Sequence, residues 1–101
     1  MLEYNGNTYE LKYSIKRIEI IENAMKKPLM TVISKGHLSI TELKCMIAYA
    51  AKKEGADAFM NPKVGMEMVE HLLEEPGGYV KLSEYVAECI ERDCPFFFQA
   101  G

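Results

Sequence analysis

Two histidines and three cysteines, set among many carboxylates, are the residues of this chain that could do chemistry. His71 has Glu67 four residues before it and Glu75 four residues after it. On a helix this spacing places the three side chains on one face, where a metal site or an acid–base site could form. The same spacing is far more typical of an exposed helix face with favourable histidine–carboxylate contacts. We therefore predict an ordinary solvated face around His71.

The cysteines lack the neighbours that catalysis or metal binding needs. Cys45, Cys89 and Cys94 form no CxxC pair, and none stands at zinc-ligand spacing from a histidine. Nothing beside Cys45 would lower the pKa of its thiol, because its helical neighbours include Met46 and Tyr49. We expect free thiols, two of them buried as small apolar side chains, rather than a nucleophile or a disulfide framework.

Phosphate-binding motifs are also missing from the sequence. Pro76-Gly77-Gly78 follows a predicted helix and lacks the lysine and the Ser/Thr of a P-loop. With no candidate catalytic group and no ligand set, the sequence predicts a protein that is not an enzyme and that holds no cofactor and no metal.

The first element that positions these residues is a β-hairpin at about residues 2–12. Apolar and polar residues alternate there on both sides of Asn5-Gly6-Asn7. The two-residue loop is either Asn5-Gly6 or Gly6-Asn7, and one face of the hairpin then carries Leu2, Tyr4, Tyr9 and Leu11. Because a lone hairpin is only marginally stable in water, that face needs helices against it.

Beyond the hairpin the apolar period lengthens to about 3.6 residues, which predicts helices. Start signals are Ser14, the capping box Ser39-Ile40-Thr41-Glu42 and Asn61-Pro62, and stop signals include Gly36 and Gly55. In the first helix we expect one apolar stripe formed by Ile15, Ile18, Ile21 and Met25. The expected helices cover residues 14–26, 28–35, 39–54, 62–75 and 79–93, followed by a tail at 95–101. The predicted fold class is mainly α (α+β): one domain over residues 1–101, with a short N-terminal β-hairpin and a compact bundle of four to five helices.

Composition favours a globular cytoplasmic protein. Of the 101 residues, 49% are apolar and 27% charged, which is ordinary for a single folded domain. The net charge is −3 and no run of Lys or Arg exceeds two residues, so we expect no nucleic-acid partner. No apolar run is long enough to span a membrane, and the N-terminus MLEYNG lacks the shape of a signal peptide, so we expect no membrane association.

Several stretches in order resemble a known family. The hairpin YNGNTYEL leads into SIKRIEIIENAMKKPL, then into a brief helix closed by glycine, and then into LSITELKCMIAYAAKKEG. This layout resembles the small tail assembly chaperones of siphophages, prophages and gene transfer agents, most strongly from Leu2 to Gly55 and less after Asn61. The shared features are structural, and no catalytic residue is among them.

The resemblance implies an assembly factor in the host cell cytoplasm. Such chaperones coat the long, hydrophobic, helical tape measure protein until tail tube subunits polymerise around it. The tape measure protein is therefore the expected partner, and the tail tube protein is a second candidate. Self-association into a homo-oligomer is also expected, because it would raise avidity along a long partner. The alternative is another small phage structural or head–tail completion protein, which the position of the gene relative to the tape measure gene would distinguish.

Adaptable apolar side chains indicate where such a partner would bind. Seven methionines are a high share, and unbranched thioether chains repack readily against helical partners. The residues we nominate as partner contacts are Met60, Met66, Tyr85, Phe96, Phe97 and Phe98.

The chain ends in PFFFQAG, with three consecutive phenylalanines. In many chaperone genes of the family that the chain resembles, some ribosomes slip near the stop codon and append a longer C-terminal domain. Phenylalanine codons can form the run of uridines that slippage needs, so we expect a programmed frameshift near the codons of Phe96 to Phe98. We also expect these rings to be at least partly covered, by the last two helices or by a neighbouring copy.

Overall fold

The chain begins with the expected hairpin, and a computed structural model, which describes residues 1–98, shows how its turn is made. Strand β1 (Leu2–Tyr4) pairs antiparallel with β2 (Asn7–Leu11), with Tyr4 opposite Asn7. The loop residues Asn5 and Gly6 have φ angles of 50° and 78°. Two positive φ angles define the type I′ turn, which asparagine and glycine adopt most easily. Of the two loops that the sequence left open, the structure has Asn5-Gly6.

A third strand replaces the end of the predicted third helix. Helix α3 (Ile40–Ala48) stops at Ala48, and β3 (Ala51–Lys53) pairs antiparallel with β2. The prediction of helix over residues 39–54 is therefore wrong at its C-terminal end. The backbone of this stretch bonds to distant segments instead of continuing the helix, since the Lys12 N–H donates to the Ala50 carbonyl and the Met60 N–H to the Ala51 carbonyl. Pairing with the hairpin thus outweighs the helix propensity of the alanines.

The other helices keep close to their expected positions. They are α1 (Ile15–Met25), α2 (Leu29–Lys35), α4 (Pro62–Leu73) and α5 (Gly78–Asp93), followed by the single 3₁₀ turn η1 (Pro95–Phe97). The predicted caps are present: the Ser14 hydroxyl accepts a hydrogen bond at the start of α1, Asn61 does so at the start of α4, and Gly36 ends α2 in the left-handed conformation. The predicted fold class, mainly α with an N-terminal hairpin, is confirmed.

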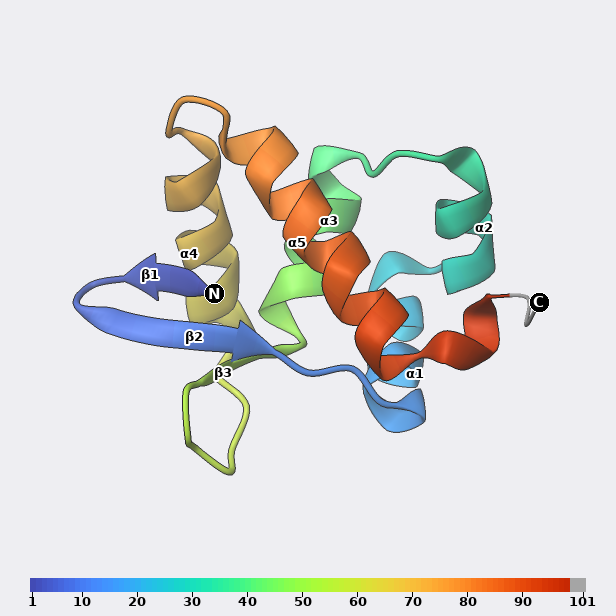
Figure 1. The fold of residues 1–101 in the computed structure, drawn as a ribbon, viewed down its shortest axis with the longest axis horizontal. Coiled ribbons are helices and arrows are strands. Elements are labelled where there is room, and N and C mark those ends of the chain that lie inside the picture. Colours follow the sequence, from blue (N-terminus) through green and yellow to red (C-terminus); the bar gives the residue numbers. More distant parts are fainter. Residues whose placement is uncertain (99–101) are drawn as a thin grey trace.

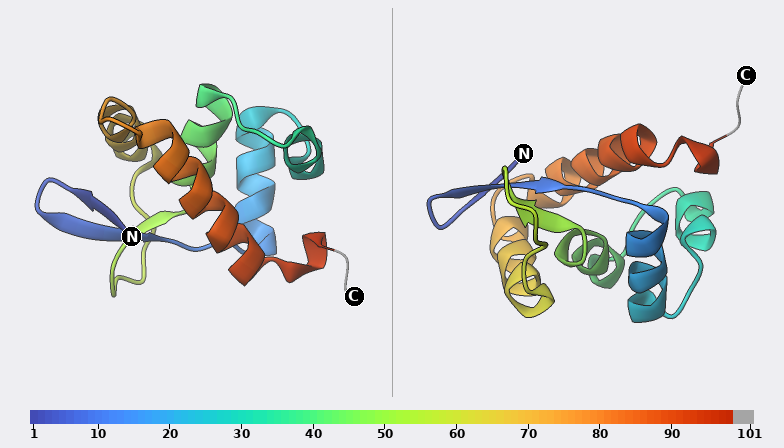
Figure 2. Two further views of the ribbon diagram at one scale, coloured as in Figure 1. Left: turned by 45° about the horizontal axis from the view of Figure 1, so that its top comes forward. Right: turned by 90° about the horizontal axis from the view of Figure 1, so that it is seen from below.

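Helix α3 is the centre of the packing. Figure 1 shows α4, α3 and α1 in succession, with α5 crossing in front of α3 and α1 and with α2 at the far edge. In the right-hand view of Figure 2, α5 lies on one side of β2 and these helices lie on the other. Because α3 contacts α1, α4 and α5, its side chains are enclosed almost all round, and Leu43, Met46, Ile47 and Ala48 are fully buried.

The apolar stripe of α1 is shorter than expected. Ile18 and Ile21 are buried and Met25 packs against the core, but Ile15 keeps 65% of its surface exposed. Ile15 is the first residue of the helix, so its side chain belongs to a turn that lies beyond the packed surface.

Polar contacts join the exit of the hairpin to the end of α5. The Tyr13 N–H donates to Asp93 Oδ2 (2.9 Å), and Arg92 Nη2 donates to the Leu11 carbonyl (2.6 Å). The buried Tyr13 hydroxyl donates to the Met46 carbonyl (2.8 Å), and burial raises the pKa of this phenol well above its usual value. These bonds join the exit of the hairpin to the end of α5 and, through the Tyr13 hydroxyl, to α3.

We predict that Gly65→Ala destabilises the protein. A Cβ at Gly65 would lie 2.9 Å from the Cα and 3.0 Å from the Cβ of Ala48, where α4 crosses α3. Overpacking of this kind costs roughly 1–3 kcal/mol, which exceeds the roughly 0.5–1 kcal/mol that alanine gains over glycine in a helix. Urea unfolding followed by circular dichroism measures the difference. The control Lys63→Ala, at an exposed position of the same helix, should leave the stability nearly unchanged, and an unchanged Gly65→Ala variant would contradict the close approach.

Candidate docking groove

A groove of about 430 Å³ lies between α2 and α5. One wall is made by α2 and the loop that follows it, the floor includes Met46 of α3, and the other wall is the length of α5 from Tyr79 to Glu91. Phe98, after η1, also lines it. The apolar residues of the two walls are Leu29, Val32, Ile33, Leu38, Tyr79, Val80, Val86, Ala87 and Ile90. The groove is therefore an apolar hollow between two helices.

The rim of this groove exposes large apolar side chains. Val80 keeps 56% of its surface exposed, Phe98 41% and Tyr79 38%. Apolar side chains gathered around a hollow are typical of a surface that binds a partner, whereas single exposed ones are ordinary. We therefore take the α2–α5 groove as the candidate functional site.

Helix α5 can line the groove because its apolar surface extends beyond its buried residues, of which Val86 and Ile90 also line the groove. Leu82, Val86, Cys89 and Ile90 are buried, while Val80 and Ala87, which are seven residues apart, are exposed and line the groove. Sequence reasoning assigned the buried face and left out Tyr79, Val80 and Ala87. The signal that could have found them is this second apolar set at a helical spacing of seven.

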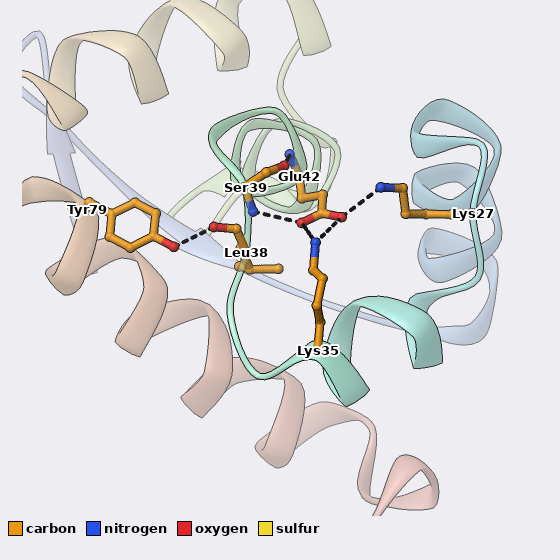
Figure 3. Close-up of polar contacts among 6 residues, drawn as sticks. All are labelled: Lys27, Lys35, Leu38, Ser39, Glu42 and Tyr79. Carbon is orange, nitrogen blue, oxygen red and sulfur yellow. Dashed lines mark hydrogen bonds and ion pairs between the residues drawn. The ribbon is translucent and has the colours of Figure 1, made fainter.

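A buried carboxylate fixes α2, the opposite wall. Glu42 is only 2% exposed, and it accepts hydrogen bonds from Lys27 Nζ (2.8 Å), Lys35 Nζ (2.6 Å) and the Ser39 N–H (2.7 Å), as Figure 3 shows. Lys27 precedes α2 and Lys35 is its last residue, so one carboxylate of α3 holds both ends of α2. These charge-assisted bonds lower the pKa of Glu42 to about 2.

Two further hydrogen bonds complete the frame of the groove. Glu22 of α1 accepts a bond from the Leu29 N–H (2.7 Å) at the start of α2. The Tyr79 hydroxyl donates to the Leu38 carbonyl, which ties the first turn of α5 to the loop before α3 (Figure 3). Glu42 and Tyr79 thus tie the two walls to the N-terminal end of α3, and Glu22 ties α2 to α1.

The six nominated contact residues, all within residues 1–98, lie at different places on the molecule. Phe98 lines the α2–α5 groove. Tyr85 lines a separate, smaller hollow of about 280 Å³ beside the hairpin, and burial raises its pKa to about 12. Met60, in the loop before α4, and Met66, on α4, are half-buried and line neither hollow. The structure does not gather these side chains into one surface.

The aromatic tail is only partly covered. Phe97 is half-buried against the core, and the ring of Phe96 lies on it at a centroid distance of 4.9 Å. Phe96 nevertheless keeps 59% of its surface exposed. The last three residues of PFFFQAG lie outside the described residues. For the three rings, the expected partial cover is clearest at Phe97, whereas Phe96 and Phe98 remain among the exposed large apolar side chains.

Apart from His37, which lines the groove, the groups that could do chemistry lie away from it. His71 is exposed, as predicted, and its ring is tilted against Tyr4 at a centroid distance of 5.5 Å. All three cysteines are buried, and burial raises the pKa of each thiol, which keeps the sulfurs protonated. Within residues 1–98, no group of three or more His, Cys, Asp or Glu side chains is placed to hold a metal ion.

Comparisons of the chain with protein-family models, with curated proteins and with solved structures found no match. Among the helices of residues 1–98, none combines the length and the apolar character needed to cross a membrane.

We predict that Glu42→Gln destabilises the protein in a pH-dependent way. The pKa of Glu42 is about 2 in the folded state against an ordinary value of 4.5, so its charge stabilises the fold above about pH 4.5 and stops doing so as the pH falls toward 2. At pH 7 we expect the variant to lose roughly 2–3 kcal/mol of unfolding free energy, and the loss to shrink steadily below about pH 4.5.

Urea unfolding at several pH values tests this expectation. Glu67→Gln, at an exposed position of α4, is the matched control and should change stability little at any pH. A difference between wild type and Glu42→Gln that stays constant from pH 7 to low pH would contradict the role of the charge.

Proposed function

We propose that this protein is a phage or prophage tail assembly chaperone, which binds and solubilises the tape measure protein in the host cell cytoplasm. The observation that carries the proposal is the apolar groove between α2 and α5, with Val80, Tyr79 and Phe98 exposed around it. A long helical protein with apolar faces would aggregate on its own, and seating such a helix in a groove covers its apolar face.

The order of the elements gives further support. The resemblance to tail assembly chaperones rests on a hairpin, a serine-capped helix, a short helix closed by glycine and a helix with a capping box. These elements occur in that order in the structure. The apolar groove lies beside the short second helix, which the buried Glu42 carboxylate holds in place.

The chaperone would act by many weak contacts along one partner. A groove of this size covers only a short part of a long helical chain, so many copies are needed for one tape measure protein, and self-association of the copies would raise avidity. Tail tube subunits would then replace the chaperone, because contacts that are individually weak dissociate quickly.

We predict that co-expression with the tape measure protein encoded by a neighbouring gene raises the soluble fraction of that protein several-fold, and that the two co-purify. Val80→Lys places a positive charge at the exposed groove rim and should abolish co-purification. The matched control is Val64→Lys, at a valine of α4 that is 43% exposed and lines no part of the groove, and it should bind as wild type does. The proposal fails if wild type neither solubilises nor retains the tape measure protein.

We also predict that the gene carries a slippery run at the codons of Phe96 to Phe98. Sequencing should find seven identical or near-identical bases there and an open frame downstream, and mass spectrometry of the natural host should find the extended product. Mixed codons without such a run, or a stop soon after the shift, would rule out a frameshift.

A further inference from the structure

We propose that the occupant of the α2–α5 groove is an amphipathic α-helix of about three turns whose apolar stripe is bordered by lysine or arginine. This inference rests on the proposed function in one respect, namely that a tape measure protein would supply the helix. The length, conformation and charge of the occupant follow from the groove itself.

The length follows from α5. The groove-lining part of α5 runs from Tyr79 to Glu91, which is about 18 Å at 1.5 Å per residue. Val80 and Ala87 stand two turns apart along this wall, and the small Ser83 and Ala87 permit close approach. An apposed helix would present side chains at positions i, i+3 or i+4, and i+7 to these sites.

The conformation follows from the hydrogen bonds of the walls. Both walls are helices whose backbone groups bond within their own turns, so a strand inserted in the groove would find no backbone partners and would leave its own polar groups unpaired. A helix satisfies its backbone internally and needs only apolar side-chain contacts. The hairpin, which carries the edge strand β1, lies at the opposite end of the molecule from α2 (Figure 1).

The charge follows from the rim. Glu84 and Glu91 both line the groove, and no ion pair engages either of them within residues 1–98.

The cations near the groove are engaged or directed elsewhere. Arg92 bonds to Asp93 and to the hairpin, Lys35 bonds to Glu42, and Lys81 lines the smaller hollow. His37 is the titratable side chain that lines the opposite wall. The acidic rim favours a partner with basic residues beside its apolar stripe.

The same charges disfavour a second copy of this chain as the occupant. In a two-fold contact centred on Ala87, Glu84 of each copy would approach Glu91 of the other, because each is three or four residues from the centre. Like charges placed opposite one another weaken such an interface.

Synthetic peptides test the charge and the conformation together. One peptide of about sixteen residues has leucines at helical i, i+3, i+4, i+7 spacing and lysines at the remaining positions, a second replaces every lysine by glutamate, and a third scrambles the order of the first. We expect the Leu/Lys helix to bind at least about tenfold more tightly than the Leu/Glu helix at low salt, with an advantage that shrinks at about 0.5 M salt, and the scrambled peptide to bind much more weakly. Chemical-shift changes on the ¹⁵N-labelled protein should fall on the groove residues.

Charge reversal of the protein separates the groove from general electrostatics. The double variant Glu84→Lys/Glu91→Lys should bind the Leu/Glu helix in preference to the Leu/Lys helix. The double variant Glu67→Lys/Glu74→Lys makes the same change of net charge at the same spacing on exposed residues of α4 and its C-cap, and it should keep the wild-type preference. All four positions are exposed, and circular dichroism verifies the fold of each variant.

Several outcomes would overturn the inference. These are equal binding of the two peptides by wild type, equal effects of the two double variants, or shift changes outside the groove. A dimer in sedimentation experiments that the Leu/Lys peptide dissociates would assign the groove to a second copy and would also overturn it.

The result also separates this inference from the proposed function. If the peptides behave as expected but the tape measure protein does not co-purify, the groove chemistry stands and the chaperone function fails. If the tape measure protein is solubilised by wild type and equally by Glu84→Lys/Glu91→Lys, the chaperone function stands and the charge rule fails.

Discussion

The carboxylate of Glu42 is the interaction on which the geometry of the groove depends. A buried carboxylate costs several kcal/mol in lost hydration unless close partners compensate it, and here two lysines and the Ser39 N–H do so. Helix α2 has only seven residues, too few to be stable as an isolated helix, and it buries only Leu29 and Val32. Its position therefore depends on the carboxylates at its ends together with these two buried side chains. A wall held by charges at its ends, rather than by a broad apolar interface, leaves its remaining apolar surface available to a ligand.

Local signals in the sequence predicted much of the fold. Ser14, Asn61 and the capping box act through hydrogen bonds within one turn, and Asn5-Gly6 acts through its own backbone angles, so neighbouring residues suffice to identify them. Strand β3 escaped prediction because its partner lies about forty residues earlier in the chain and its residues, Ala51, Lys52 and Lys53, favour a helix when considered alone. Pairing with the distant strand β2, rather than local helix propensity, therefore determines the structure of this segment.

The groove could not be predicted for a related reason. The capping box identified Glu42 as a helix-start residue, but the contacts with Lys27 and Lys35 depend on how α1, α2 and α3 meet. In the same way, Val80 and Ala87 become part of a groove only because α2 stands opposite them. Phe98, which was nominated from composition, lines the groove. Tyr85 lines the smaller hollow, and Met60 and Met66 line neither. Composition indicated which apolar side chains could contact a partner. The tertiary structure determines which of them lie on the same surface.

The bonds from Arg92 and Asp93 to the hairpin have a consequence for the order of synthesis. They join residues 81 and 80 positions apart, so the first strands made by the ribosome wait for the last helix before their contacts are complete. Folds that depend on such distant contacts close late. Since α5 is also one wall of the groove, a chain still being translated, or one truncated before α5, has no groove to offer. The groove is thereby tied to synthesis of α5, so copies of the chain that stop before this helix lack one of its two walls.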